Sequence, residues 1–392
     1  MRLSRPAAAI AALTACLAGA APVRAVPPAG PVPAARSVTS QGHRSVGSLP
    51  PGTPVRVEPL ADGLRPDGAG RAWVLDHVST SWNGHRTVVS GTLALPRGSA
   101  PPGGWPVVSF GHGLSGLADG CAPSVTGPSA WERVVRETLV RAGFAIAVTD
   151  YQGVGTPGPG IVGTGTTDAR TMADIVRAAR RTAPVSRDWE SLGYSIGAQA
   201  SLFAGSSIGS YAPELRHVGS IAMAPPTQWT GWMSGLRASG PSTTPVPAAV
   251  VYLSDVLARV HPDRYRVEDW FTARGMAFAD RAQSVCIDRM AEDLAGVTFR
   301  DLVKDPEAFT GKLVEMVAEL EVPVRRFPRP VYIAHGTDDV LPVALSELTA
   351  RQLAAAGTDV TFVPVPGADH ITLLPRVAPD VLAWTRTLFS ST

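Results

Sequence analysis

The stretch of this sequence that could most directly do chemistry is Gly-Tyr-Ser-Ile-Gly at residues 193–197, a Gly-x-Ser-x-Gly pattern centred on Ser195. Apolar residues 189–192 precede it and residues 198–203 suit a helix, so a strand, a sharp turn and a helix are predicted. Glycines flank such a turn because a Cβ there would collide with the neighbouring strand or helix. In a chain with 39 glycines the pattern alone is equally consistent with a glycine-rich loop. The strand and helix context identifies Ser195 as the candidate nucleophile.

A serine nucleophile needs a base to take its proton and an acid to hold that base in one tautomer. When the nucleophile lies on such a turn, the chain order is serine, acid, histidine. His370 follows the last predicted strand, and the adjacent Asp338 and Asp339 follow an earlier one. Two spacings give different candidates for the acid. Counting three residues on from Gly336, the common Gly-x-x-Asp spacing, selects Asp339, whereas counting four residues back from Pro342 selects Asp338. We favour Asp339 and expect the other aspartate to face solvent or cap the following turn.

The oxyanion that forms when a serine attacks an ester needs two hydrogen-bond donors. The first is expected from the backbone N–H of Ile196, directly after the nucleophile. The second is expected from the glycine-rich loop at residues 111–116, which follows an apolar strand. We assign it to the N–H of Leu114, with Gly113 as the alternative.

Apolar strands alternate with amphipathic helices along most of the chain, which predicts βαβ units in a mostly parallel sheet with functional loops at its carboxyl edge. Asn83-Gly84 predicts a hairpin between the first two strands. The alternation stops for about a hundred residues after residue 223 and then resumes. Strands are expected at 73–78, 87–95, 105–110, 144–148, 189–192, 215–223, 331–334 and 360–365, and helices at 131–141, 168–181, 345–356 and 377–388.

The first 25 residues have the pattern of an export signal: arginines 2 and 5, an apolar run at 7–21, and a cleavage site at Val23-Arg24-Ala25. Leu13-Thr14-Ala15-Cys16 also resembles a lipobox, whose cysteine would be lipidated. We favour cleavage and secretion, because apolar residues continue after Cys16, and keep lipid anchoring in the cell envelope as the alternative. No later stretch reaches the roughly 20 apolar residues that a membrane span requires.

Composition limits the remaining choices. The net charge is +2 and no lysine or arginine block is present, so nucleic acid is not expected as a partner. Residues 26–55 are rich in proline and glycine without apolar periodicity, which predicts a flexible arm. We expect an α/β core at 56–225 and 328–392, interrupted by an insertion at 226–327.

Three segments together resemble the secretory lipases of bacteria and fungi, which have the α/β-hydrolase fold. They are residues 111–116 with Cys-Ala-Pro-Ser at 121–124, residues 150–158, and the helix at 174–180 before the nucleophile. The resemblance covers about residues 70–390. Two departures are the spacing from the aspartates to Pro342, one residue tighter than usual, and the Gly/Pro/Thr run at 156–167, where relatives often carry an aromatic residue.

The insertion resembles the helical cap, or lid, of these lipases. About two thirds of its large apolar side chains are expected in the cap's own core, and the rest could line an acyl channel. They are Trp229, Trp232, Met233, Tyr252, Leu253, Trp270, Phe271, Phe278, Phe299 and Phe309.

Cys121 and Cys286 are expected to form a disulfide. Once Cys16 is removed or lipidated, they are the two thiols left in an oxidising compartment. The bond would tie the cap to the catalytic core.

The sequence therefore predicts a secreted lipase or esterase that acts on acyl esters, such as triacylglycerol-like lipids, through an acyl-enzyme. Acyl transfer or peptide cleavage by the same triad remains open, as does a non-catalytic envelope protein that binds lipid. No cofactor and no metal are expected. We expect a monomer that contacts a lipid interface transiently through the cap.

Overall fold

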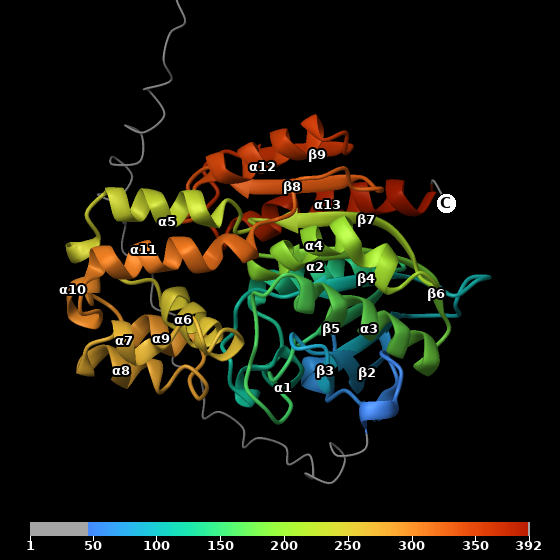
Figure 1. Ribbon diagram of the computed structural model, residues 1–392. Coiled ribbons are helices and arrows are strands. Elements are labelled where there is room, and N and C mark those ends of the chain that lie inside the picture. The colour runs from blue at the N-terminus through green and yellow to red at the C-terminus, as the bar shows by residue number, and fades with distance from the viewer. Residues whose placement is uncertain (1–45, 391–392) are drawn as a thin grey trace, which may run out of the picture.

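A nine-stranded sheet forms the centre of the protein (Figure 1). The structure is a computed structural model and describes residues 46–390. The strand order is β1-β2-β3-β5-β4-β6-β7-β8-β9; β1, β2, β3 and β5 pair antiparallel in turn, and every later pair is parallel. The strands are β1 (Pro54–Pro59), β2 (Ala69–Thr80), β3 (Arg86–Pro96), β4 (Trp105–Gly111), β5 (Ala145–Thr149), β6 (Val185–Tyr194), β7 (Arg216–Met223), β8 (Val331–Gly336) and β9 (Val360–Val365). The mostly parallel sheet predicted from the sequence is confirmed.

Helices cover both faces of this sheet, and the strand sequences explain why. The central strands are buried on both sides, as parallel strands between two helix layers are. In β4, Val107 belongs to the hydrophobic cluster that includes side chains of α3, α4 and α12, whereas Val108 belongs to the cluster that includes side chains of α2 and α13. The helices of the core are α1 (Pro123–Thr126), α2 (Ala130–Arg141), α3 (Thr166–Thr182), α4 (Ile196–Tyr211), α12 (Val343–Ala355) and α13 (Leu373–Ser390).

The start of the described chain differs from the expected flexible arm. Val46 is buried against Val78 and Val88, and β1 pairs with β2 at the edge of the sheet. Because β1 is an edge strand, Val55 and Val57 stay 43% exposed, which explains why no apolar pattern marks it. The arm prediction is therefore wrong for residues 46–55. The rest of the arm, the signal segment and Cys16 lie outside the described residues.

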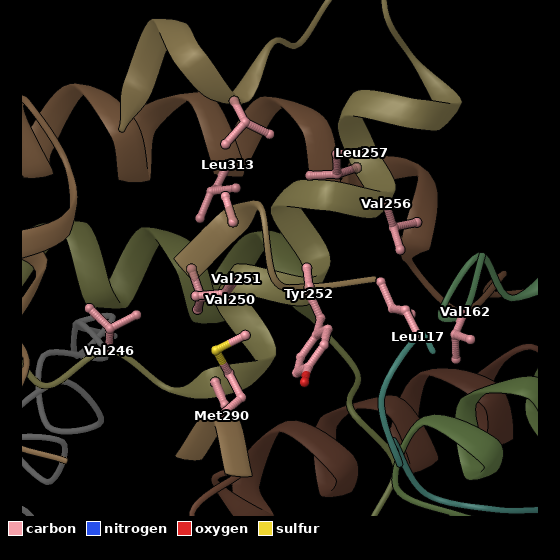
Figure 2. Close-up of a cluster of buried hydrophobic side chains, with 14 of the residues drawn as sticks. Leu117, Val162, Val246, Val250, Val251, Tyr252, Val256, Leu257, Met290 and Leu313 are labelled. Carbon is pink, nitrogen blue, oxygen red and sulfur yellow. The ribbon is translucent and has the colours of Figure 1, made fainter. Parts of the chain in front are cut away.

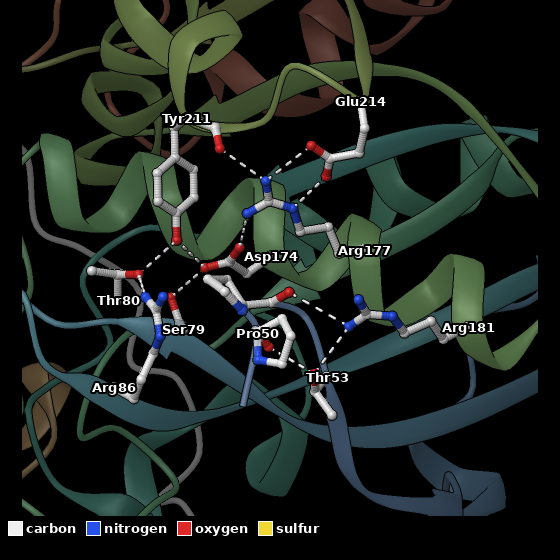
Figure 3. Close-up of polar contacts among 11 residues, drawn as sticks. Pro50, Thr53, Ser79, Thr80, Arg86, Asp174, Arg177, Arg181, Tyr211 and Glu214 are labelled. Atoms are coloured by element: carbon white, nitrogen blue, oxygen red, sulfur yellow. Dashed lines mark hydrogen bonds and ion pairs between the residues drawn. The ribbon is translucent and has the colours of Figure 1, made fainter. Parts of the chain in front are cut away.

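A buried carboxylate joins three elements of the core (Figure 3). Asp174 of α3 accepts hydrogen bonds from Ser79 of β2 at 2.7 Å, from the Tyr211 hydroxyl at the end of α4 at 2.8 Å, and from Arg177 at 2.8 Å. Arg177 also pairs with Glu214 beyond α4. These contacts fix the helix that precedes the nucleophile strand against both α4 and the antiparallel strands.

Seven α-helices lie between β7 and β8 and form a unit beside the sheet (Figure 1). They are α5 (Trp229–Ala238), α6 (Ala248–Val260), α7 (Val267–Trp270), α8 (Ala273–Ala279), α9 (Ile287–Asp293), α10 (Phe299–Leu302) and α11 (Pro306–Met316). Their side chains share one hydrophobic cluster, which also includes Leu117 and Val162 from loops of the core (Figure 2). The helical elements of the insertion expected at 226–327 run from residue 229 to residue 320.

Most of the large apolar side chains expected in the insertion fill this cluster. Six of the ten are buried in it, and the other four are partly buried against it. The buried six are Trp229, Met233, Tyr252, Phe271, Phe299 and Phe309, and the partly buried four are Trp232, Leu253, Trp270 and Phe278.

The insertion is tied to the loop that follows β4. Cys121 and Cys286 form a disulfide with their Cα atoms 5.4 Å apart, which confirms the predicted pairing. Beside it, the Ile287 N–H donates to the Ser115 carbonyl at 2.9 Å. Gly116 packs so tightly there that a Cβ would lie 2.9 Å from both the Cys121 sulfur and the Cys286 Cα. The loop expected to supply an oxyanion donor is therefore fastened to the insertion.

The disulfide should contribute substantially to stability, because it closes a loop of 165 residues. On the chain-entropy model such a loop is worth roughly 5 kcal/mol, less any strain in the native state. We expect the Cys121→Ser/Cys286→Ser double variant to unfold at a clearly lower guanidinium concentration than the oxidised protein. Reductant should lower the midpoint of the parent and leave that of the double variant unchanged. Equal midpoints for the oxidised parent and the double variant would show that packing alone holds the insertion.

Candidate active site

Ser195 lies at the strained turn between β6 and α4. Its φ is 54° and its ψ is −122°, a backbone conformation that residues other than glycine rarely adopt. A Cβ on Gly193 would lie 1.9 Å from the Gly197 carbonyl oxygen, and a Cβ on Gly197 would lie 2.1 Å from the Gly111 carbonyl oxygen. Both flanking glycines are thus required by close backbone contacts, as the sequence pattern indicates.

The three residues predicted to work together are in hydrogen-bond contact. The Ser195 hydroxyl lies 3.0 Å from His370 Nε2, and His370 Nδ1 lies 2.8 Å from Asp339 Oδ2. Because a carboxylate only accepts, Nδ1 carries the proton and Nε2 is left to accept the serine proton. This is the geometry of a nucleophile, a base and an orienting acid.

Surrounding groups favour the ionised form of Asp339. Its side chain is buried, which alone would raise the pKa, but the nearby His335 imidazole at 3.4 Å, the hydrogen bond from His370 and the Leu341 N–H together lower that pKa to about 2. Asp338, by contrast, is exposed and accepts a hydrogen bond from the neighbouring Thr337 hydroxyl at 2.9 Å. The geometry therefore favours Asp339 over Asp338, which takes the solvent-facing position expected of the other aspartate.

Two backbone N–H groups near Ser195 lack a hydrogen-bond partner among the described residues. Ile196 begins α4, so its N–H has no partner within the helix, and within residues 46–390 neither it nor the Leu114 N–H makes a hydrogen bond. The Gly113 N–H instead donates to Glu132 Oε1 at 2.9 Å. Gly113 was the alternative donor, and this contact argues against it because its N–H is already used inside the protein.

Gly113 itself lies against the nucleophile. A Cβ there would be 3.6 Å from the Ser195 Cβ and 2.9 Å from the Tyr194 ring. The loop after β4 and the turn after β6 therefore meet at one point, as the predicted carboxyl-edge arrangement requires. The side chains of Leu114 and Ile196 both pack against the hydrophobic cluster of the insertion.

Three further residues lie at this site, although no sequence motif marks them as functional. Tyr194 packs against His370 with the two rings tilted and their centroids 5.0 Å apart, His335 approaches Asp339 at 3.4 Å, and Glu132 accepts the Gly113 N–H. The position of Tyr194 in the Gly-x-Ser-x-Gly pattern is open to any residue. His335 could have been noticed four positions before Asp339, whereas Glu132 is recognisable in sequence only as part of a capping box with Ser129.

Residues 46–390 contain no group of three or more His, Cys, Asp or Glu side chains placed to hold a metal ion. Over the same range, every helix is too short or too polar to cross a membrane.

Sequence comparisons connect this geometry to lipases. A family model described as secretory lipase matches residues 126–392. A Mycobacterium tuberculosis protein named a probable inactive lipase is 23% identical over 364 residues, covering 87% of this chain and 79% of the relative. A secreted triacylglycerol lipase of Malassezia globosa is also 23% identical, over 67% of this chain. The chain spans only 57% of that fungal lipase.

Solved structures show the same fold. Lipase A of Candida antarctica in its closed state superposes with a TM-score of 0.72 at 20% identity, covering 89% of this chain and 85% of the lipase. The rice cell wall degrading esterase LipA of Xanthomonas oryzae superposes with a TM-score of 0.69 at 15% identity, covering 87% of this chain and 99% of the esterase. Because the family model matches more than half of the chain, this protein belongs to the secretory lipase family and is a carboxylic-ester hydrolase of the α/β-hydrolase fold.

Proposed function

We propose that this protein is a lipase or esterase that cleaves acyl esters, of the triacylglycerol type, through an acyl-enzyme on Ser195. The observation that carries the proposal is the continuous contact from Ser195 through His370 to Asp339, at 3.0 and 2.8 Å. A buried, ionised Asp339 holds the histidine in the tautomer that can accept the serine proton.

The reaction then proceeds in two halves. The Ser195 oxygen attacks the ester carbonyl while His370 Nε2 takes its proton, and the carbonyl oxygen becomes an oxyanion that accepts hydrogen bonds from the Ile196 and Leu114 N–H groups. His370 gives its proton to the departing alcohol, which leaves the acyl group on Ser195. Water, deprotonated by His370, releases the acid by the same steps in reverse.

The insertion supports an apolar acyl substrate. Leu114 and Ile196 present their backbones to the reacting carbonyl and their side chains to the hydrophobic cluster of the insertion. An acyl chain bound at the reacting carbon would therefore meet that cluster first. The fungal relative is named a triacylglycerol lipase, which is consistent with this choice.

Three other functions use the same fold. Acyl transfer or peptide cleavage needs the same nucleophile and differs only in what attacks or leaves. A non-catalytic lipid-binding role deserves a test because one relative is named a probable inactive lipase. The complete contact from Ser195 to Asp339 favours catalysis in this chain.

Secretion fits both the family and the relatives. We propose that residues 1–25 are removed and that the enzyme acts outside the cell. Anchoring through a lipidated Cys16 is the alternative, and the mass of the mature protein distinguishes the two.

The mature protein should hydrolyse p-nitrophenyl esters, and Ser195→Ala should lower turnover at least about 10³-fold without loss of folding. Rates measured over esters of increasing chain length give the acyl preference, and circular dichroism checks that the variant is folded. A folded Ser195→Ala variant with nearly full activity, or an alkyl fluorophosphonate adduct that maps to another residue, would refute the acyl-enzyme.

Asp339→Asn should lower kcat by orders of magnitude, because an amide at that position lets the imidazole settle in the wrong tautomer. Asp338→Asn is the matched control, since it makes the same change one residue away on an exposed side chain. We expect the control to keep nearly full activity in the same ester assay. A crippled Asp338→Asn beside a normal Asp339→Asn would reverse the assignment.

A further inference from the structure

The hydrogen bonds around Gly113 restrain both of its peptide units. In the first unit, the His112 carbonyl accepts from the Tyr151 hydroxyl at 2.8 Å and the Gly113 N–H donates to Glu132 Oε1 at 2.9 Å. In the second unit, the Gly113 carbonyl accepts from His112 Nδ1 at 2.6 Å. The remaining group of the second unit is the Leu114 N–H.

Peptide planarity turns these contacts into a direction for the Leu114 N–H. In a trans peptide the C=O of one residue and the N–H of the next point in opposite directions. Once His112 holds the Gly113 carbonyl, the Leu114 N–H must point to the other side. Glycine has no Cβ and rotates freely, so this orientation depends on the partners around it.

Glu132 is the charged member of this group and is itself held firmly. It is 5% exposed and lies in the first turn of α2, where its Oε2 accepts from the Ser129 N–H at 3.2 Å and the Ser129 hydroxyl at 2.8 Å. The guanidinium of Arg136, one turn later, is also buried; burial lowers its pKa to about 10, with Glu132 acting in the opposite direction, so it stays charged at neutral pH. A buried carboxylate fixed by two hydrogen bonds from Ser129 is a rigid acceptor for the Gly113 N–H.

We propose that Glu132 is a positioning residue for the oxyanion site: by holding the Gly113 N–H, it keeps the Leu114 N–H directed at the developing oxyanion. Glu132 touches neither substrate nor nucleophile and acts only through Gly113, together with His112 and Tyr151. This inference rests on the proposed function, because it assigns the Leu114 N–H to the oxyanion.

The competing explanation is structural, since Glu132 also completes the capping box of α2. The same helix supplies a matched control. Glu137 Oε1 accepts the Asp67 N–H at 3.0 Å, so Glu137 too holds the backbone of a distant segment, and Glu137→Ala removes the same charge and the same number of atoms. The Asp67 segment does not belong to the site.

The experiment compares Glu132→Ala, Glu132→Gln and Glu137→Ala in the hydrolysis of p-nitrophenyl butyrate. Inhibition by butylboronic acid, which forms a tetrahedral adduct with a serine nucleophile, is measured in parallel. We expect Glu132→Ala to lower kcat at least about 10-fold, with KM changed by less than about 3-fold and boronic acid affinity weakened about as much as kcat. Glu132→Gln should recover most of the rate, because an amide oxygen can accept the Gly113 N–H. Glu137→Ala should match the wild type in kcat and boronic acid affinity.

Glu132→Asp covers the case in which Glu132→Ala does not fold. It keeps the charge beside Arg136 and withdraws the carboxylate from Gly113 by one methylene, so its kcat should also fall while its KM is maintained. Unchanged kcat and boronic acid affinity in folded Glu132→Ala or Glu132→Asp would overturn the inference, as would an equal loss in Glu137→Ala. A wild-type protein without ester turnover would instead overturn the proposed function, so the two failures are distinguishable.

Discussion

The contact on which the site depends is the approach of α4 to the end of β4. Gly197 lies so close to the Gly111 carbonyl that a Cβ would come within 2.1 Å of it. Because the first turn of the nucleophile's helix rests directly on the end of a neighbouring strand, the loop that continues from β4 must pass beside Ser195. The candidate nucleophile and the proposed second oxyanion donor, the Leu114 N–H, are thus placed together by one backbone contact, before any side chain takes part.

The insertion is attached to the same loop after β4 and places an apolar surface beside it. It is joined to the loop after β4 by the Cys121–Cys286 disulfide and by the hydrogen bond from Ile287 to Ser115, immediately after Leu114. The side chains of Leu114 and Ile196 end in its hydrophobic cluster. Leu114 and Ile196 therefore belong to both regions: their side chains contact the hydrophobic cluster, and their backbone N–H groups are the proposed donors to the reacting carbonyl.

Periodicity and chain order were enough to predict the sheet, its helices and the contact from Ser195 to His370, because strand ends and sharp turns leave local signals. Spacing alone favoured Asp339 over Asp338, which share one loop; in the structure Asp339 contacts His370, whereas Asp338 faces solvent. Strand β1 was missed because an edge strand that keeps Val55 and Val57 half exposed lacks an apolar pattern. The bond from Glu132 to Gly113 leaves no pattern either, since it joins a helix to a backbone group 19 residues away.

A crystal structure of the protein after reaction with an alkyl fluorophosphonate tests most directly whether Ser195 and the two N–H groups form one reaction centre. We predict a bond from phosphorus to the Ser195 oxygen, with the phosphoryl oxygen about 2.7–3.1 Å from the backbone nitrogens of both Ile196 and Leu114. The alkyl chain should lie against the hydrophobic cluster of the insertion. Phosphorus bound to another residue, or a phosphoryl oxygen directed away from both nitrogens, would contradict this account.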